Sequence, residues 1–253
     1  ISLAYNQVIE LFPNGGGGYK VATNLLGPHA GLVSGAALIV DYVLTIAISI
    51  ASGADAMFSL LPLGMHDFKI GFEFVAIIAL VALNLRGMKE AIKFLLPIFL
   101  GFVIVHVFLI IYGVYAHAER LPSLIPDTLN ESAVLARDTG WIFVVSTILL
   151  AYSQGGGTYT GLEAVSNNVN TLAEPRVATG KWTMFYMATS LAFTAGGIML
   201  LYLLWDAAHS PGQTLNAVVF KSIIDHFDFG GKVINDGALF GVLPVLPCPT
   251  GAI

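Results

Sequence analysis

Residues 141–170 contain the feature that most constrains the fold, an apolar stretch interrupted by glycines. Residues 141–152 are apolar enough to lie in a bilayer, and the glycines that follow are Gly155, Gly156, Gly157 and Gly161. Each interior glycine costs a helix about 1 kcal/mol relative to alanine, so a continuous α-helix is disfavoured here. Lipid cannot satisfy the backbone groups exposed at such a break, which is tolerated only where it lines a cavity or binds a ligand. Broken helices of this kind are typical of substrate sites in secondary transporters.

The composition indicates an all-α integral membrane protein. Only 11% of the 253 residues are charged and 56% are hydrophobic, whereas a soluble domain carries roughly 25% charged residues. A net charge of -5 leaves no basic footprint for nucleic acid, and the single cysteine, Cys248, excludes an intrachain disulfide. Because the sequence opens and stops inside apolar segments, we expect an internal fragment of a longer transporter. The expected single, partial transmembrane domain covers residues 1–253, with spans at about 1–12, 30–52, 70–85, 94–116, 141–168 (broken) and 182–205, and a stub at 239–253.

Basic residues in the short connections set the expected orientation in the membrane. The side predicted to be cytoplasmic collects Lys20, Arg86, Lys89, Lys93, Arg176 and Lys181. Residues 119–138 are then expected to form a polar loop on the outer side. Residues 216–229 are amphipathic, which predicts a segment that lies at the interface or packs on an external face.

Asp41 is the most informative single residue, because a charged aspartate at the centre of a membrane helix costs about 2.5 kcal/mol or more. Thr45 and Ser49 follow at i+4 and i+8 and share its face of the helix, and Tyr42 flanks them. This pattern favours a site for a cation or a proton. A structural alternative stays open: Asp41 could join two helices through hydrogen bonds, and the hydroxyls could bond to carbonyls of their own helix.

Thr160 and Glu163 begin the helical piece after the break. Their spacing also fits a capping box, which would close this helix end without any substrate. Carbonyls freed by the glycines are good ligands for a hard cation, whereas the N-terminus of the second half-helix favours an anion. With Asp41 on the same site, a pair of carboxylates would repel a substrate carboxylate, attract a monovalent cation and be able to share a proton.

Other motifs are interpreted as structural. The run at residues 15–18 lacks the lysine directly after glycine that a phosphate-binding loop needs, so it predicts a turn at the membrane face. His106 is expected to pack between helices, and Tyr159 to form a wall of the cavity. Neither a hydrolase motif nor zinc-ligand spacing occurs in the sequence, so we expect a protein that is not an enzyme.

Three sequence motifs resemble the amino acid–polyamine–cation (APC) transporter superfamily: FPNGGGGYKVATNLLGP, GLVSGAALIVDYVLTIAISIASGADA and TGLEAVSNNV. The last two are most similar to its KimA-like potassium-importer branch, and the resemblance covers residues 1 to about 205. It implies the LeuT/APC-type inverted-repeat fold, here partial, with helices two to seven and a stub of helix eight. Helix six would be the broken one, and helix one, with further ligands, would precede Ile1, so this fragment alone should not transport.

The resemblance also implies a ligand set for potassium. The residues matching the importer pattern are Asp41, Tyr42, Thr45 and Ser49 on helix three and Thr160 and Glu163 on helix six. The function implied is proton-coupled potassium uptake by a multi-pass protein of the plasma membrane, without a cofactor beyond the coupling proton. The alternatives are an amino acid permease, proton- or sodium-coupled, on the same fold, and a non-transporting membrane scaffold. The expected partners are the lipid bilayer, a small cation or amino acid substrate and a second copy in a homodimer.

Overall fold

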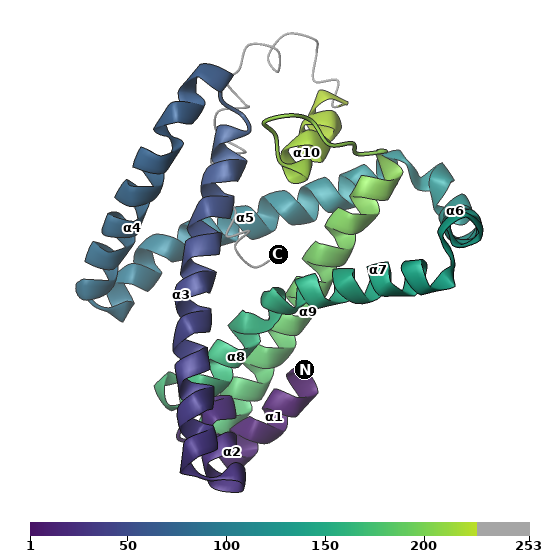
Figure 1. Cartoon of the computed structure of the whole chain (residues 1–253). Helices are drawn as coiled ribbons and strands as arrows, with labels where there is room; N and C mark the ends of the chain where they lie inside the picture. Colours follow the sequence, from purple (N-terminus) through teal and green to yellow (C-terminus); the bar gives the residue numbers. More distant parts are fainter. Residues whose placement is uncertain (227–253) are drawn as a thin grey trace. The chain divides into compact units, whose positions relative to one another are not determined.

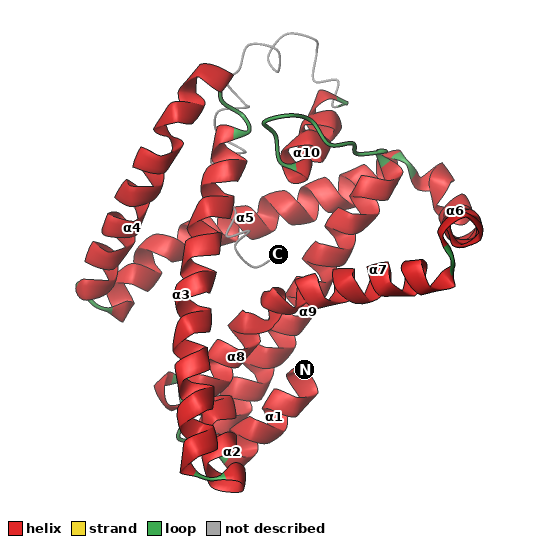
Figure 2. Ribbon diagram, in the orientation of Figure 1, coloured by secondary structure: helices red, strands yellow, loops and turns green. Residues whose placement is uncertain are grey.

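The computed structural model describes residues 1–226, and over that range it contains helices and no β-strand (Figures 1 and 2). The all-α prediction is therefore confirmed. The predicted stub at 239–253 and Cys248 lie outside the described residues. The α-helices, in chain order, are α1 (Ser2–Leu11), α2 (Gly17–Leu26), α3 (Pro28–Phe58), α4 (Lys69–Leu85), α5 (Met88–Ala116), α6 (Leu121–Thr139), α7 (Trp141–Gln154), α8 (Thr160–Asn167), α9 (Arg176–Leu204) and α10 (Leu215–Asp225). Short 3-10 helices are η1 (Leu63–Phe68), η2 (Ala118–Arg120), η3 (Gly155–Tyr159) and η4 (Val169–Thr171).

Within the described residues, four helical segments are long and apolar enough to cross a membrane: Pro28–Phe58, Gly64–Leu85, Lys89–Ala116 and Arg176–Leu204. A fifth apolar segment, Trp141–Gly157, is shorter. Large apolar side chains such as Ile39, Ile78 and Phe108 stay exposed on these helices. Water would penalise that exposure, whereas the hydrocarbon core of a bilayer does not.

Glycines with positive φ separate several helices. Gly27 has φ +97° and ends α2, and Pro28 directly after it begins α3. Proline suits this first helical position because its missing N–H would have no partner there. Gly87, at φ +122°, and Gly140, at φ +87°, likewise precede α5 and α7. A residue with a side chain rarely adopts such angles, so these helix ends are fixed by the sequence.

The chain divides into two compact units. The first comprises Ile1–Ile48 and Tyr152–Phe193, and the second comprises Ser49–Ala151 with the described residues from Thr194 onward. In the first unit, α1, α2 and α8 pack against one another (Figure 1). Its buried core combines Ile9 of α1, Leu162 of α8, Val169 of η4 and Met184 of α9. This packing holds α8, which carries Glu163, against the start of the chain.

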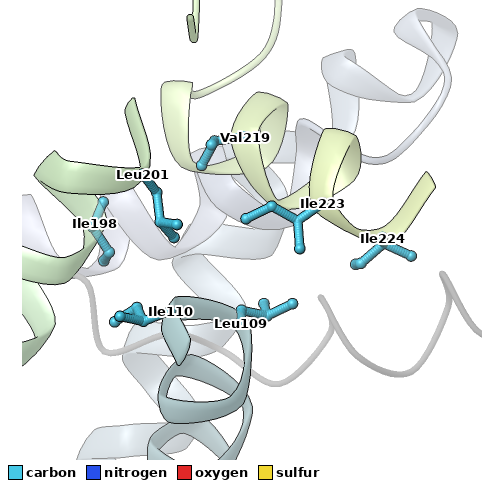
Figure 3. Close-up of a cluster of buried hydrophobic side chains, with 7 residues drawn as sticks. All are labelled: Leu109, Ile110, Ile198, Leu201, Val219, Ile223 and Ile224. Atoms are coloured by element: carbon cyan, nitrogen blue, oxygen red, sulfur yellow. The ribbon is translucent and has the colours of Figure 1, made fainter. Parts of the chain in front are cut away.

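The second unit has its own core, where α5, α9 and α10 meet (Figure 3). Its buried side chains are Leu109, Ile110, Ile198, Leu201, Val219, Ile223 and Ile224. His106 is 3% exposed beside this core, its Nδ1 lies 2.9 Å from the Phe102 carbonyl oxygen, and its ring meets Phe220 edge-on. The prediction that His106 packs between helices is therefore confirmed.

Three segments differ in detail from expectation. Residues 119–138, predicted as a polar loop, form η2 and most of α6 instead. The polar composition hid a helical period, because Leu121, Ile125 and Leu129 recur every four residues. A helix that was not predicted, α2, begins inside the glycine run, at Gly17. The amphipathic segment from residue 216 belongs to α10, which packs on α5.

Candidate functional site

The predicted break in the apolar helix is present. The α-helix α7 ends at Gln154, the 3-10 helix η3 occupies Gly155–Tyr159, and α8 begins at Thr160. The chain therefore stays helical through the glycines, but its hydrogen bonds change from the α-helical to the 3-10 pattern. A 3-10 stretch inside a helix often marks a functional hinge. Gly156 and Gly157 lie at its exposed surface.

A cavity of about 600 Å³ opens beside this break, in the first unit. Its lining consists of Ile1, Ala4, Tyr5, Val8, Asp41, Tyr152, Ser153, Gly156, Gly157, Tyr159 and Glu163. Tyr159 thus forms part of the wall, as predicted. The described lining residues include two carboxylates and no Lys, Arg or His side chain. The cavity consequently presents negative charge, hydroxyl groups and glycine backbone to whatever enters it.

The predicted residues of α3 occupy different environments. Asp41 is exposed and lines the cavity. Tyr42 is half-buried, and its hydroxyl accepts a hydrogen bond of 2.8 Å from Nδ2 of Asn167. Thr45 is half-buried and is absent from the described lining, and Ser49 belongs to the second unit. The structure therefore brings Asp41 to the cavity directly and Tyr42 next to α8.

Of the two residues predicted on the broken helix, Glu163 lies near Asp41. The half-buried Glu163 lines the same cavity, and its carboxylate lies close enough to Asp41 for the two charges to interact. The side chain of Thr160 lies outside the described part of the structure. Thr160 is the first residue of α8 and Tyr159 occupies the N-cap position without a side-chain capping bond, so the capping-box register expected for Thr160 and Glu163 is not formed.

The predicted glycines have separate roles. Gly156 and Gly157 contribute backbone to the cavity, whereas Gly155 and Gly161 are absent from its described lining. A Cβ at Gly161 would lie 3.0 Å from Cε of Met187 on α9. Gly161 is therefore a position of close helix packing.

The sequence model of the amino acid permease family matches residues 2–243. The chain belongs to this family. It is also 32% identical over 214 residues to the potassium transporter KimA of Bacillus subtilis (strain 168). The alignment covers 84% of this chain and 34% of that relative, so the chain spans about a third of the relative's length. These findings confirm the resemblance to the APC superfamily, and the all-helical structure is consistent with a partial transporter fold.

Two side chains of this family member that the sequence did not single out complete the surroundings of Glu163. Tyr5 of α1 and Asn167 of α8 both lie near its carboxylate. Asn167 follows Glu163 at i+4 and therefore shares its helix face, a signal that was available in the sequence. Tyr5 comes from a helix far away in the chain, and nothing in its local sequence indicates that contact.

Proposed function

We propose that this membrane transporter takes up potassium, driven by protons, as a multi-pass protein of the plasma membrane. One observation carries the proposal: Asp41 and Glu163 line one cavity beside a helix break, where the described lining offers no basic side chain. A monovalent cation together with one proton neutralises two carboxylates. The substrate named for the similar protein of Bacillus subtilis, potassium, agrees with this chemistry.

An amino acid substrate fits the described lining less well. Its carboxylate needs a positive partner, and the N-terminus of α8 supplies only about half of an elementary charge. Asp41 and Glu163 together place more negative charge than that on the same cavity. The family is described as amino acid permeases, so transport of an amino acid is the alternative outcome of the experiment.

The experiment uses the complete protein that contains this chain, produced in bacteria that lack their own potassium uptake systems. Growth at limiting potassium and uptake of rubidium are measured for wild type, Asp41→Asn and Glu163→Gln. The matched control is Glu131→Gln, which neutralises an exposed carboxylate on α6. Losing a charged ligand group weakens binding by about tenfold or more, so both site variants should fail at limiting potassium while the control grows.

Each result has a distinct meaning. Rescue by wild type and the control, lost in both site variants, supports the potassium site. Rescue that persists in Asp41→Asn and Glu163→Gln contradicts the assignment of these residues. If wild type fails to rescue growth but restores uptake in an amino acid transport mutant, the protein is a permease for amino acids.

A further inference from the structure

Asn167, the last residue of α8, joins the acidic cavity to the glycine turn, which we define as Gly15, Gly16 and Gly17. Its side chain lies between Tyr42 of α3, Glu163 one turn earlier on α8, and Gly17 at the start of α2. All of these residues belong to the first unit. The proposed function assigns no role to Asn167.

The amide nitrogen of Asn167 serves the cavity side. It donates to the Tyr42 hydroxyl at 2.8 Å, and Glu163, one turn earlier on the same face of α8, lies beside it. An amide NH₂ group carries two hydrogens, so the nitrogen that donates to Tyr42 keeps a second hydrogen for the carboxylate. Since Tyr42 follows Asp41 on α3, this nitrogen links the helices that supply the two carboxylates.

The oxygen atoms of Asn167 face the glycine turn. A Cβ at Gly17 would lie 1.9 Å from Oδ1 of Asn167, so position 17 has no room for a side chain. The Gly16 N–H donates to the Asn167 carbonyl oxygen at 3.0 Å, and a Cβ at Gly15 would lie 2.6 Å from the same oxygen. Oδ1 is buried and has no hydrogen-bond partner among the described residues. The glycines therefore let the turn approach Asn167 more closely than any other residue type would.

We propose that Asn167 is a positioning residue, which orients the Glu163 carboxylate toward the cavity and ties its position to the glycine turn. This inference rests on the proposed function, because it concerns the same cation site. The turn bonds to the backbone carbonyl of Asn167 through the Gly16 N–H, so a shift of Asn167 when a cation binds at Glu163 also displaces the turn. The turn lies on the side predicted to be cytoplasmic, so occupancy of the site is transmitted to that side.

The first measurement separates substrate affinity from turnover. Rubidium uptake by the complete protein gives KM and the maximal rate for Asn167→Ala and Asn167→Asp. Asparagine and aspartate have the same shape, but aspartate lacks both donor hydrogens. We expect both variants to raise KM about tenfold with little change in maximal rate. The matched control is Asn168→Ala, because Nδ2 of Asn168, at the end of α8, donates to the Ala164 carbonyl oxygen at 2.9 Å and to no other acceptor among the described residues.

The second measurement follows the turn itself. A cysteine replaces the exposed Asn14 in a background in which Cys248 and every other cysteine of the complete protein are replaced by serine, and its labelling by a membrane-impermeant maleimide is timed in inside-out vesicles. Potassium should change the labelling rate in this protein and in the version that also carries Asn168→Ala. With Asn167→Ala or Asn167→Asp added, the rate should be the same with and without potassium. A side chain that only fills space would not remove this response.

The outcomes separate the two proposals. A wild-type KM in both Asn167 variants, or a labelling rate that still responds to potassium in them, overturns the role of Asn167 while leaving the potassium site intact. If Asn167→Ala does not fold, Asn167→Asp decides the question by the same two measurements. A wild-type protein that takes up no rubidium refutes the potassium proposal itself, and with it the inference that rests on that site.

Discussion

Replacing Gly17 by alanine tests the contact between the glycine turn and α8. Gly17 has φ +43°, and a Cβ there would lie 1.9 Å from Oδ1 of Asn167 and 2.9 Å from Oγ of Ser166. The left-handed backbone costs an alanine about 1–2 kcal/mol. The Asn167 side chain must also move, which removes its bond to Tyr42 at a cost of about 1 kcal/mol. The free energy of unfolding should therefore fall by about 2–3 kcal/mol.

Gly27→Ala gives a comparison in which backbone strain acts without a steric clash, at a ψ of 171° that is almost exclusive to glycine and costs an alanine about 1–3 kcal/mol. Gly27 also has positive φ, +97°, but nothing lies within 4 Å of its Cβ position. Thermal unfolding of the purified complete protein in detergent gives the comparison. Both variants should melt below wild type, and only the loss in Gly17→Ala should depend on the Asn167 side chain.

A double mutant makes the reasoning refutable. Removing the Asn167 side chain takes away the atoms that the new Cβ would strike, so the two changes should not be additive. In an Asn167→Ala background, Gly17→Ala should cost only its backbone strain, about 1–2 kcal/mol, whereas the cost of Gly27→Ala should be unchanged. If the costs of Gly17→Ala and Asn167→Ala simply add, the close approach of the turn to Asn167 is not what requires glycine at position 17.

The remaining predictions concern the second unit. Gly113→Ala should destabilise the protein by about 1–3 kcal/mol in thermal unfolding, because its Cβ would lie 2.5 Å from Cδ2 of Leu201. Gly196→Ala, with nothing within 4 Å of its Cβ position, should be neutral or stabilising. Equal effects of the two changes would contradict the close approach of Gly113 to Leu201. Arg120 hydrogen-bonds to Asp206 at 2.7 Å and holds the pKa of that carboxyl below its usual value. A depressed pKa contributes stability above the ordinary value and loses it as the pH falls, so the stability difference between wild type and Arg120→Gln should shrink below about pH 4. A difference in melting temperature that stays constant from neutral to acidic pH would show that the ion pair is not its cause.

The helices could be predicted because the bilayer leaves few alternatives for a long apolar run. Residues 30–52 and 94–116 were expected as spans, and α3 and α5 contain them. Reliance on apolar content gave a wrong prediction at residues 119–138, which were expected to be a loop. The recurrence of Leu121, Ile125 and Leu129 every four residues indicates the helix there. α2 was overlooked because a run of glycines usually stops structure, whereas here Gly17 begins a helix that packs against α8.

Sequence reasoning could predict the candidate site only where a residue type carries a free-energy penalty in its setting. A charged carboxylate inside an apolar span carries an insertion penalty, so Asp41 and Glu163 were identifiable from the sequence. The structure brings both to one cavity. Tyr5 and Asn167 carry no comparable free-energy penalty on a helix, so their residue types do not indicate a site. Their importance comes from the packing of α1, α2 and α8, which joins segments far apart in the chain. Sequence reasoning therefore identified the charged groups and missed the neutral side chains of Tyr5 and Asn167, which lie beside Glu163.

On the proposed function, the presence of two carboxylates at one cavity has a mechanistic consequence. A single carboxylate can hold either a cation or a proton, since each neutralises the same charge, and would therefore favour exchange of one for the other. Coupled movement in the same direction requires both to be held at once, which two acidic groups allow. Asp41 and Glu163 come from different segments, α3 and α8, so a change at the helix break alters the distance between them. Moving the carboxylates apart or together changes how strongly they repel when empty, and thus links the conformation of the break to loading of the site.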